Sequence, residues 1–158
     1  MLWGAVDNTD ENNLMRRFGT CLVTYSLEGK PGDDTYMKLI SRNDDFNDHT
    51  LGYGDTMWED EDGHTYLYTT SNYKVAVART ATHDLSSQWE YYVADPQGNF
   101  SWTTEYPSTQ DAEYSTIIPL ESGCSMPWVF KKGDTYYMIG QSIWFGRDVL
   151  MFRSKHPY

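Results

Sequence analysis

Apolar and polar residues alternate in short runs along most of this chain, and turn residues separate the runs. The clearest runs are 55–60, 65–70, 74–80 and 89–93. Alternation with a period of two places successive side chains on opposite faces of a β-strand. No window shows the apolar spacing of a long amphipathic helix. The pattern therefore predicts an all-β chain.

One arrangement of apolar run, turn and tyrosine-rich run occurs twice. Residues 57–70, MWEDEDGHTYLYTT, recur as PWVFKKGDTYYMIG at 127–140, a constant offset of 70 residues. Trp58 then matches Trp128, and a glycine occupies the turn in both copies. Each copy predicts a β-hairpin, because glycine adopts the positive φ angles of a tight turn. A hairpin that recurs at such a long spacing is typical of β-propeller blades.

Three blade-like segments follow one another at about 18–50, 53–104 and 123–158. We expect them to form one incomplete domain over 1–158, resembling a five-bladed β-propeller with only two to three four-stranded blades present. An open propeller leaves strand edges unpaired. The chain would therefore pack against the remainder of a longer propeller chain, or associate with copies of itself through its open blade edges.

Further strands are expected outside the clearest runs. The first segment predicts strands over 18–27 and 35–41, and the last segment predicts a strand over 149–154. Short strands are also expected at 99–104 and 114–118, between prolines and glycines that end them.

Composition narrows the range of partners. Aromatic residues make up 16% of the chain, with 13 Tyr and 6 Trp, which favours strands and a buried core. The formal net charge of −11 argues against a nucleic-acid partner, because phosphate backbones are bound by Lys and Arg. Acidity with many rings suits a neutral sugar, or it merely keeps the protein in solution. No segment has the apolar length of a membrane span, so no membrane partner is expected.

The residues that commonly hold metals are scattered. Cys21 and Cys124 could form one disulfide or remain two thiols, and no Cys-x-x-Cys or His-x-x-x-His pair is present. The acidic run 59–62 lacks the alternation of a calcium loop. No metal site and no cofactor are expected.

Several segments together carry a family resemblance. They are DTMWEDEDGHTYLY at 55–68, VART at 77–80, DL at 84–85, WE at 89–90 and FRSKHPY at 152–158. This pattern resembles the blade signature of five-bladed β-propeller glycoside hydrolases of the family 43 type, and of related uncharacterised carbohydrate-associated propeller domains. The resemblance implies an oligosaccharide or polysaccharide partner and a secreted or periplasmic location.

The resemblance also implies three carboxylates: a general base, a general acid and a residue that sets the acid's pKa. Hydrolysis of a glycosidic bond needs two carboxyl groups in opposite protonation states on either side of the bond. Asp55 matches the inner-strand aspartate of the family, as base or pKa-setting residue. Ser125 stands where the family has its acidic glutamate, and a hydroxyl cannot replace that acid. Glu113 or Glu121 could supply a substitute carboxylate, and Asp7 or residues beyond this chain could supply the third.

Candidate substrate contacts lie near these carboxylates. Trp144 and Phe145, in an inserted loop, could form a platform on which a sugar ring stacks. His49 and Tyr53 precede Asp55 closely and are candidate contacts together with Ser125.

The function expected from the sequence is carbohydrate processing by hydrolysis. Two alternatives remain open at this point: a non-catalytic carbohydrate-binding propeller, which the serine at position 125 favours, and a structural or assembly module.

Overall fold

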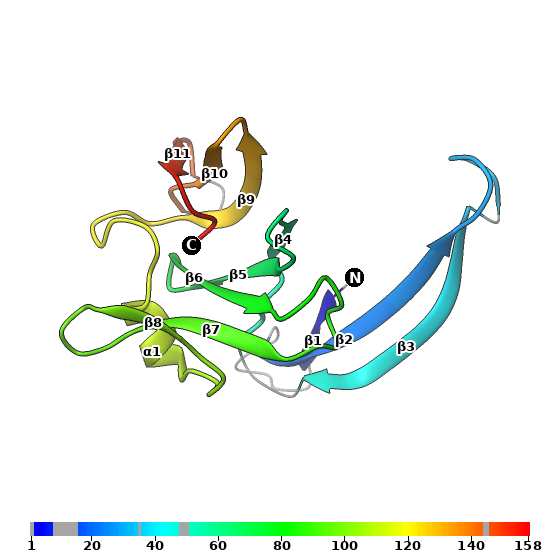
Figure 1. Cartoon of the computed structure of the whole chain (residues 1–158), viewed down its shortest axis with the longest axis horizontal. Helices are drawn as coiled ribbons and strands as arrows, with labels where there is room; N and C mark the ends of the chain where they lie inside the picture. The colour runs from blue at the N-terminus through cyan, green and yellow to red at the C-terminus, as the bar shows by residue number, and fades with distance from the viewer. Residues whose placement is uncertain (1, 8–15, 35, 48–50, 144–145) are drawn as a thin grey trace. The chain divides into compact units, whose positions relative to one another are not determined.

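The computed structural model describes residues 2–7, 16–34, 36–47, 51–143 and 146–158 (Figure 1). The chain divides into two compact units, Met1–Gly52 and Tyr53–Tyr158, called unit 1 and unit 2. The described residues contain no helix that is long and apolar enough to cross a membrane.

Unit 1 contains an antiparallel sheet of order β1-β2-β3. Its strands are β1 (Leu2–Asp7), β2 (Arg16–Leu27) and β3 (Met37–Asn47). The last two form a long hairpin, as the sequence predicted, although β3 extends further than expected. Strand β1 was not predicted.

Unit 2 contains two antiparallel sheets in which consecutive strands are neighbours. The five-stranded sheet consists of β4 (Thr56–Glu59), β5 (Thr65–Ser71), β6 (Lys74–Thr80), β7 (Trp89–Ala94) and β8 (Phe100–Thr103). The three-stranded sheet consists of β9 (Ser125–Lys132), β10 (Thr135–Gln141) and β11 (Val149–Ser154). Both predicted hairpins are present, and the all-β prediction is confirmed.

The predicted strand at 114–118 is wrong. Residues 115–118 form no strand, and a short helix, α1 (Thr109–Tyr114), ends where the strand was expected to begin. Ser108 caps it, because its hydroxyl accepts the N–H of Asp111 while the Asp111 carboxylate accepts the N–H of Ser108. This reciprocal capping box satisfies two backbone donors of the first turn, and it makes a helix more favourable than a strand.

The core of unit 2 lies between its two sheets. Tyr66, Tyr68, Val75 and Val77 share one face of the five-stranded sheet, and they pack against a cluster that includes Val129 of β9. Trp58, Tyr92 and Trp102 border the same cluster.

The first strands of the two sheets, β4 and β9, are neighbours and start at the same end. At one end, the backbone N–H of Cys124, just before β9, donates to the carbonyl of Tyr73 in the β5–β6 turn, at 2.7 Å. At the other end, Lys131 of β9 lies 3.1 Å from the carboxylate of Glu61, which follows β4. Side-by-side first strands of consecutive antiparallel sheets are expected of propeller blades. Closure into a five-bladed ring remains a prediction.

Candidate functional site

Three of the predicted site residues, Asp55, Glu113 and Ser125, are tied to one end of unit 2. We call this the strand-start end, because β4 and β9 both begin there. It comprises residues 54–55, the β5–β6 turn, residues 122–125 and Gln141 at the end of β10. Hydrogen bonds between these segments define its geometry.

Asp55 begins the five-stranded sheet. Its side chain is exposed, and its Oδ2 accepts the backbone N–H of Thr70 at 3.0 Å. The backbone N–H groups of Gly54 and Asp55 both donate to the carbonyl of Tyr68, at 2.9 and 3.0 Å. Gly54 has φ of 115°, a conformation that favours glycine, which allows this double contact. Asp55 is therefore fixed against the end of β5.

Glu113 projects from α1 to the same hairpin. It is half-buried, and its Oε1 accepts hydrogen bonds from the hydroxyl of Ser71, at 3.3 Å, and from the side-chain amide of Asn72. Asn72 and Tyr73 have φ of 45° and 62°, as in a type I′ turn. Asp55 and Glu113 thus bind the consecutive residues 70 and 71, and both carboxylates lie at this hairpin end.

Ser125 is the first residue of β9 and is only 4% exposed. Its Oγ is buried and has no hydrogen-bond partner among the described residues, and the same holds for Oε1 of Gln141, which is opposite Ser125 in the strand register. Buried polar atoms are usually hydrogen-bonded. Both atoms are closed off from solvent, so a polar ligand could use their hydrogen-bonding capacity only after the surrounding segments move.

Glu121 lies in an exposed turn that the N–H of Ser122 closes by donating to the carbonyl of Pro119 at 2.8 Å. The Lys74 ammonium, at the start of β6, donates to the carbonyls of Leu120 and Ser122. The turn that carries Glu121 is therefore attached to the same hairpin as Asp55 and Glu113, through a lysine that sequence reasoning did not select.

Tyr53, which was predicted to contact the substrate, does not lie on the surface. It is buried, and its ring centroid lies 5.3 Å from that of Tyr91 and 6.3 Å from that of Tyr106. Burial raises the pKa of the Tyr53 phenol well above its ordinary value. A tyrosine in such a cluster contributes mainly to the core.

The remaining predicted contacts, His49, Trp144 and Phe145, lie outside the described residues, as does the side chain of Asp7. Cys21 and Cys124 are free thiols, so no disulfide joins them. Within the described part of the chain, no group of three or more His, Cys, Asp or Glu side chains could hold a metal ion.

Comparison with protein families gives a match along the whole chain. Residues 1–158 match the model described as a domain of unknown function, DUF5005. The chain belongs to the DUF5005 family. No curated protein matches it.

A solved structure resembles this DUF5005 chain closely. It is the crystal structure of a "putative hydrolase" from Bacteroides ovatus ATCC 8483, with 92% sequence identity and a TM-score of 0.94. The match covers 99% of this chain and 39% of that protein. The DUF5005 chain therefore spans about two-fifths of its relative's length.

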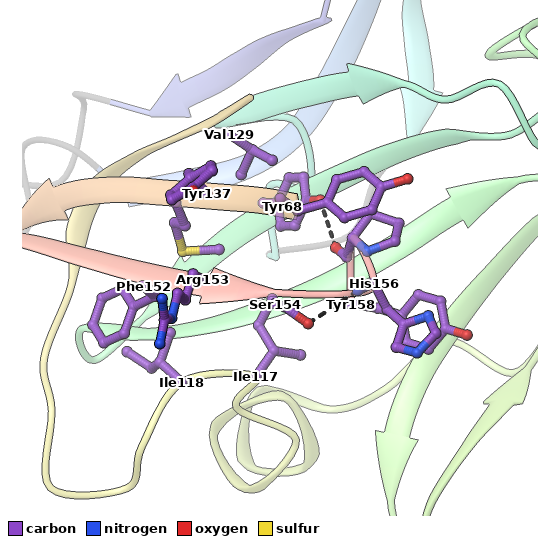
Figure 2. A pocket seen from close by; sticks show the side chains of 13 residues that line it. Tyr68, Ile117, Ile118, Val129, Tyr137, Phe152, Arg153, Ser154, His156 and Tyr158 are labelled. Carbon is purple, nitrogen blue, oxygen red and sulfur yellow. Dashed lines mark hydrogen bonds between the residues drawn. The ribbon is translucent and has the colours of Figure 1, made fainter. Parts of the chain in front are cut away.

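A pocket also lies inside unit 2 of the DUF5005 chain (Figure 2). It encloses about 80 Å³ and is lined mainly by aromatic and aliphatic side chains of β5, β9, β10 and β11 and of the segments 117–118 and 156–158. The Tyr68 hydroxyl donates to the carbonyl of Pro157 at 2.6 Å beside it. Neither Asp55, Glu113 nor Ser125 lines this pocket, so it belongs to the core rather than to the candidate site.

Proposed function

We propose that this DUF5005 chain is part of a carbohydrate-processing hydrolase and that the strand-start end of unit 2 faces the substrate. The single observation that carries the proposal is the attachment of Asp55 and Glu113 to consecutive residues of one hairpin. The description of the Bacteroides ovatus relative as a hydrolase supports the reaction class. The blade resemblance supports an oligosaccharide or polysaccharide substrate and a secreted or periplasmic location.

Asp55 is the carboxylate we assign to activate water or to orient the acid. It is exposed, and its Oδ2 accepts the backbone N–H of Thr70. An exposed carboxylate can accept a hydrogen bond from a water molecule or a sugar hydroxyl. Glu113, which accepts two hydrogen bonds on Oε1, and the exposed Glu121 are the candidates for the acid.

The test uses a longer polypeptide of the relative's length that contains residues 1–158, assayed against plant and bacterial polysaccharides. Asp55→Asn keeps an oxygen that can accept the Thr70 N–H, so folding should persist. We expect it to lower kcat by a factor of about 10² or more, as loss of a general base does. Asp134→Asn, which changes an exposed carboxylate in the β9–β10 turn, serves as the control. Unchanged hydrolysis in Asp55→Asn would remove this residue from the mechanism.

A second function, binding without hydrolysis, is favoured by Ser125. This residue replaces the acid that the resemblance implies, and its buried Oγ has no hydrogen-bond partner in the part of the chain that the structure describes. In that case calorimetry would show polysaccharide binding without released sugar. Ser125→Ala would weaken binding by a factor of about 5–10, the cost of one hydrogen bond, and Asp55→Asn would leave turnover at background.

A further inference from the structure

One face of the three-stranded sheet of unit 2 is mostly apolar and half-buried to exposed, although Arg153, opposite Tyr137, and Gln141, opposite Val149, also lie on it. It carries Trp128, Phe130, Tyr137, Ile139, Val149 and Met151, which we call the outer face. Trp128 and Met151 are each 63% exposed and Val149 is 72% exposed. Surface apolar residues that stand singly are ordinary, but a contiguous patch of rings and aliphatic chains marks an interaction site.

The strand register makes the outer face continuous. Ile139 in the central strand is opposite Trp128 on one side and Met151 on the other. Phe130 and Tyr137 stack with ring centroids 5.3 Å apart and an interplanar angle of 14°. The six side chains therefore cross all three strands on one face.

The opposite face of the same sheet packs into the core of unit 2. Val129 and Met138 are buried in the core of unit 2, and Phe152 packs against them. Through this face, the three-stranded sheet covers the face of the five-stranded sheet that carries Trp58. Trp128 is the sequence counterpart of Trp58, but its side chain is exposed.

We propose that a further β-sheet, contributed by the same polypeptide in its longer form, packs its aliphatic and aromatic face on the outer face. Two observations select this occupant. The structural relative has a chain of which this one makes up only 39%, so additional polypeptide is available there. The outer face also resembles a face of the five-stranded sheet, which comes earlier in the chain. The three-stranded sheet covers that face.

Charge argues against a second copy as the occupant. Each chain carries a formal net charge of −11, and two such chains repel each other as they approach. A sheet from the same polypeptide is already tethered, so it meets the outer face at a high effective concentration. The proposal does not depend on whether the protein hydrolyses or only binds a carbohydrate.

The first test leaves the sequence unchanged. Hydroxyl-radical footprinting compares modification of Trp128 in the 158-residue chain and in the longer polypeptide. Tyr114 is the internal reference, because it is 67% exposed and lies on α1 rather than on the outer face. We expect the modification rate of Trp128, relative to Tyr114, to fall about fivefold or more in the longer polypeptide, since covered side chains lose solvent contact. Equal relative rates in the two proteins would overturn the proposal.

The second test compares Trp128→Glu with Tyr114→Glu. In the longer polypeptide, Trp128→Glu should lower Tm by about 5 °C or more, because it places an unpaired charge in an apolar contact, whereas Tyr114→Glu should have little effect. In the 158-residue chain, both variants should keep the parental Tm. Trp128→Phe should restore the Tm of the longer polypeptide.

Other occupants give different outcomes. If a second copy covers the outer face, the 158-residue chain will be a dimer in sedimentation and Trp128→Glu will dissociate it. If unit 1 covers it, Trp128→Glu will lower the Tm of the 158-residue chain itself. Either result contradicts the proposal.

Discussion

At the scale of single residues, Asp60 joins the two sheets of unit 2. Its Oδ2 accepts the indole N–H of Trp58, at 3.0 Å, and the hydroxyl of Tyr136 from β10. Burial by itself would raise the pKa of Asp60, but the hydrogen bonds from Tyr136, Trp58 and the backbone N–H of Asp62 more than offset this effect. The pKa of Asp60 therefore lies below its ordinary value.

A depressed carboxyl pKa makes the folded state less stable in acid. The stabilisation is fully present above the unfolded pKa of about 4 and is lost as the pH falls through the folded value. Tyr136→Phe removes one donor, so we expect the free energy of unfolding at pH 7 to fall by about 1.5 kcal/mol. The difference between variant and parent should shrink below about pH 4. Urea titrations at several pH values measure both effects, and Tyr137→Phe, on the other face of β10, is the control.

Gly140 has almost no room for a side chain. A Cβ at this position would overlap Sγ of Cys124 and lie 2.9 Å from the carbonyl oxygen of Ser125. We expect Gly140→Ala to lower the free energy of unfolding by about 1–3 kcal/mol, as overpacking does. The double variant with Cys124→Ala should lose less than the sum of the two single variants, because the sulfur no longer obstructs the methyl group. Additive losses in chemical denaturation would contradict this explanation.

At the scale of elements, the β5–β6 turn combines an unusual backbone with the candidate site. Asn72 has φ of 45°, and its side-chain amide donates to Glu113. Asn72→Gly keeps the backbone conformation and loses the hydrogen bond, so it should cost about 1 kcal/mol. Asn72→Ala loses the same hydrogen bond but keeps a Cβ in the left-handed region, which glycine occupies without strain, so it should cost about 1 kcal/mol more than Asn72→Gly. Equal losses in the two variants, measured by thermal unfolding, would show that the turn conformation does not matter.

Local turn chemistry explains which elements the sequence predicted. The hairpins around Gly63 and Gly133 were predicted because glycine marks each turn, and both glycines have positive φ, 93° and 58°. Helix α1 was missed because its capping box, Ser108 to Asp111, has aspartate where glutamate or glutamine is usual. Strand β1 has no comparable turn signal to define it.

The candidate site was predictable only in part. Asp55 was selected because, eight residues before Gly63, it matches the inner-strand aspartate of the family that the chain resembles. The attachment of Glu113 to residues 71 and 72 was not foreseen, since it depends on where α1 lies against β5, β6 and β7. Contacts between segments some 40 residues apart follow from three-dimensional arrangement, which no local pattern encodes.

At the scale of the whole molecule, the buried core cluster belongs entirely to unit 2. We expect a polypeptide of residues 53–158 to fold without unit 1 and to unfold cooperatively, because it retains that cluster. In unit 1, the described side chains that are buried are few: Thr20, Val23 and Leu51. Near-ultraviolet circular dichroism during heating measures the transition, and a gradual loss of signal in 53–158 would contradict the expectation.

The contact between Tyr68 and Pro157 has a consequence for synthesis. It joins residues 89 positions apart. The ring of Tyr158, the next residue, stacks on the ring of Tyr66, and their centroids are 6.1 Å apart. During translation, the rings of β5 leave the ribosome long before the segment that covers them. The nascent chain must therefore keep an aromatic surface open for that interval, and a chaperone that binds such surfaces would protect it from aggregation.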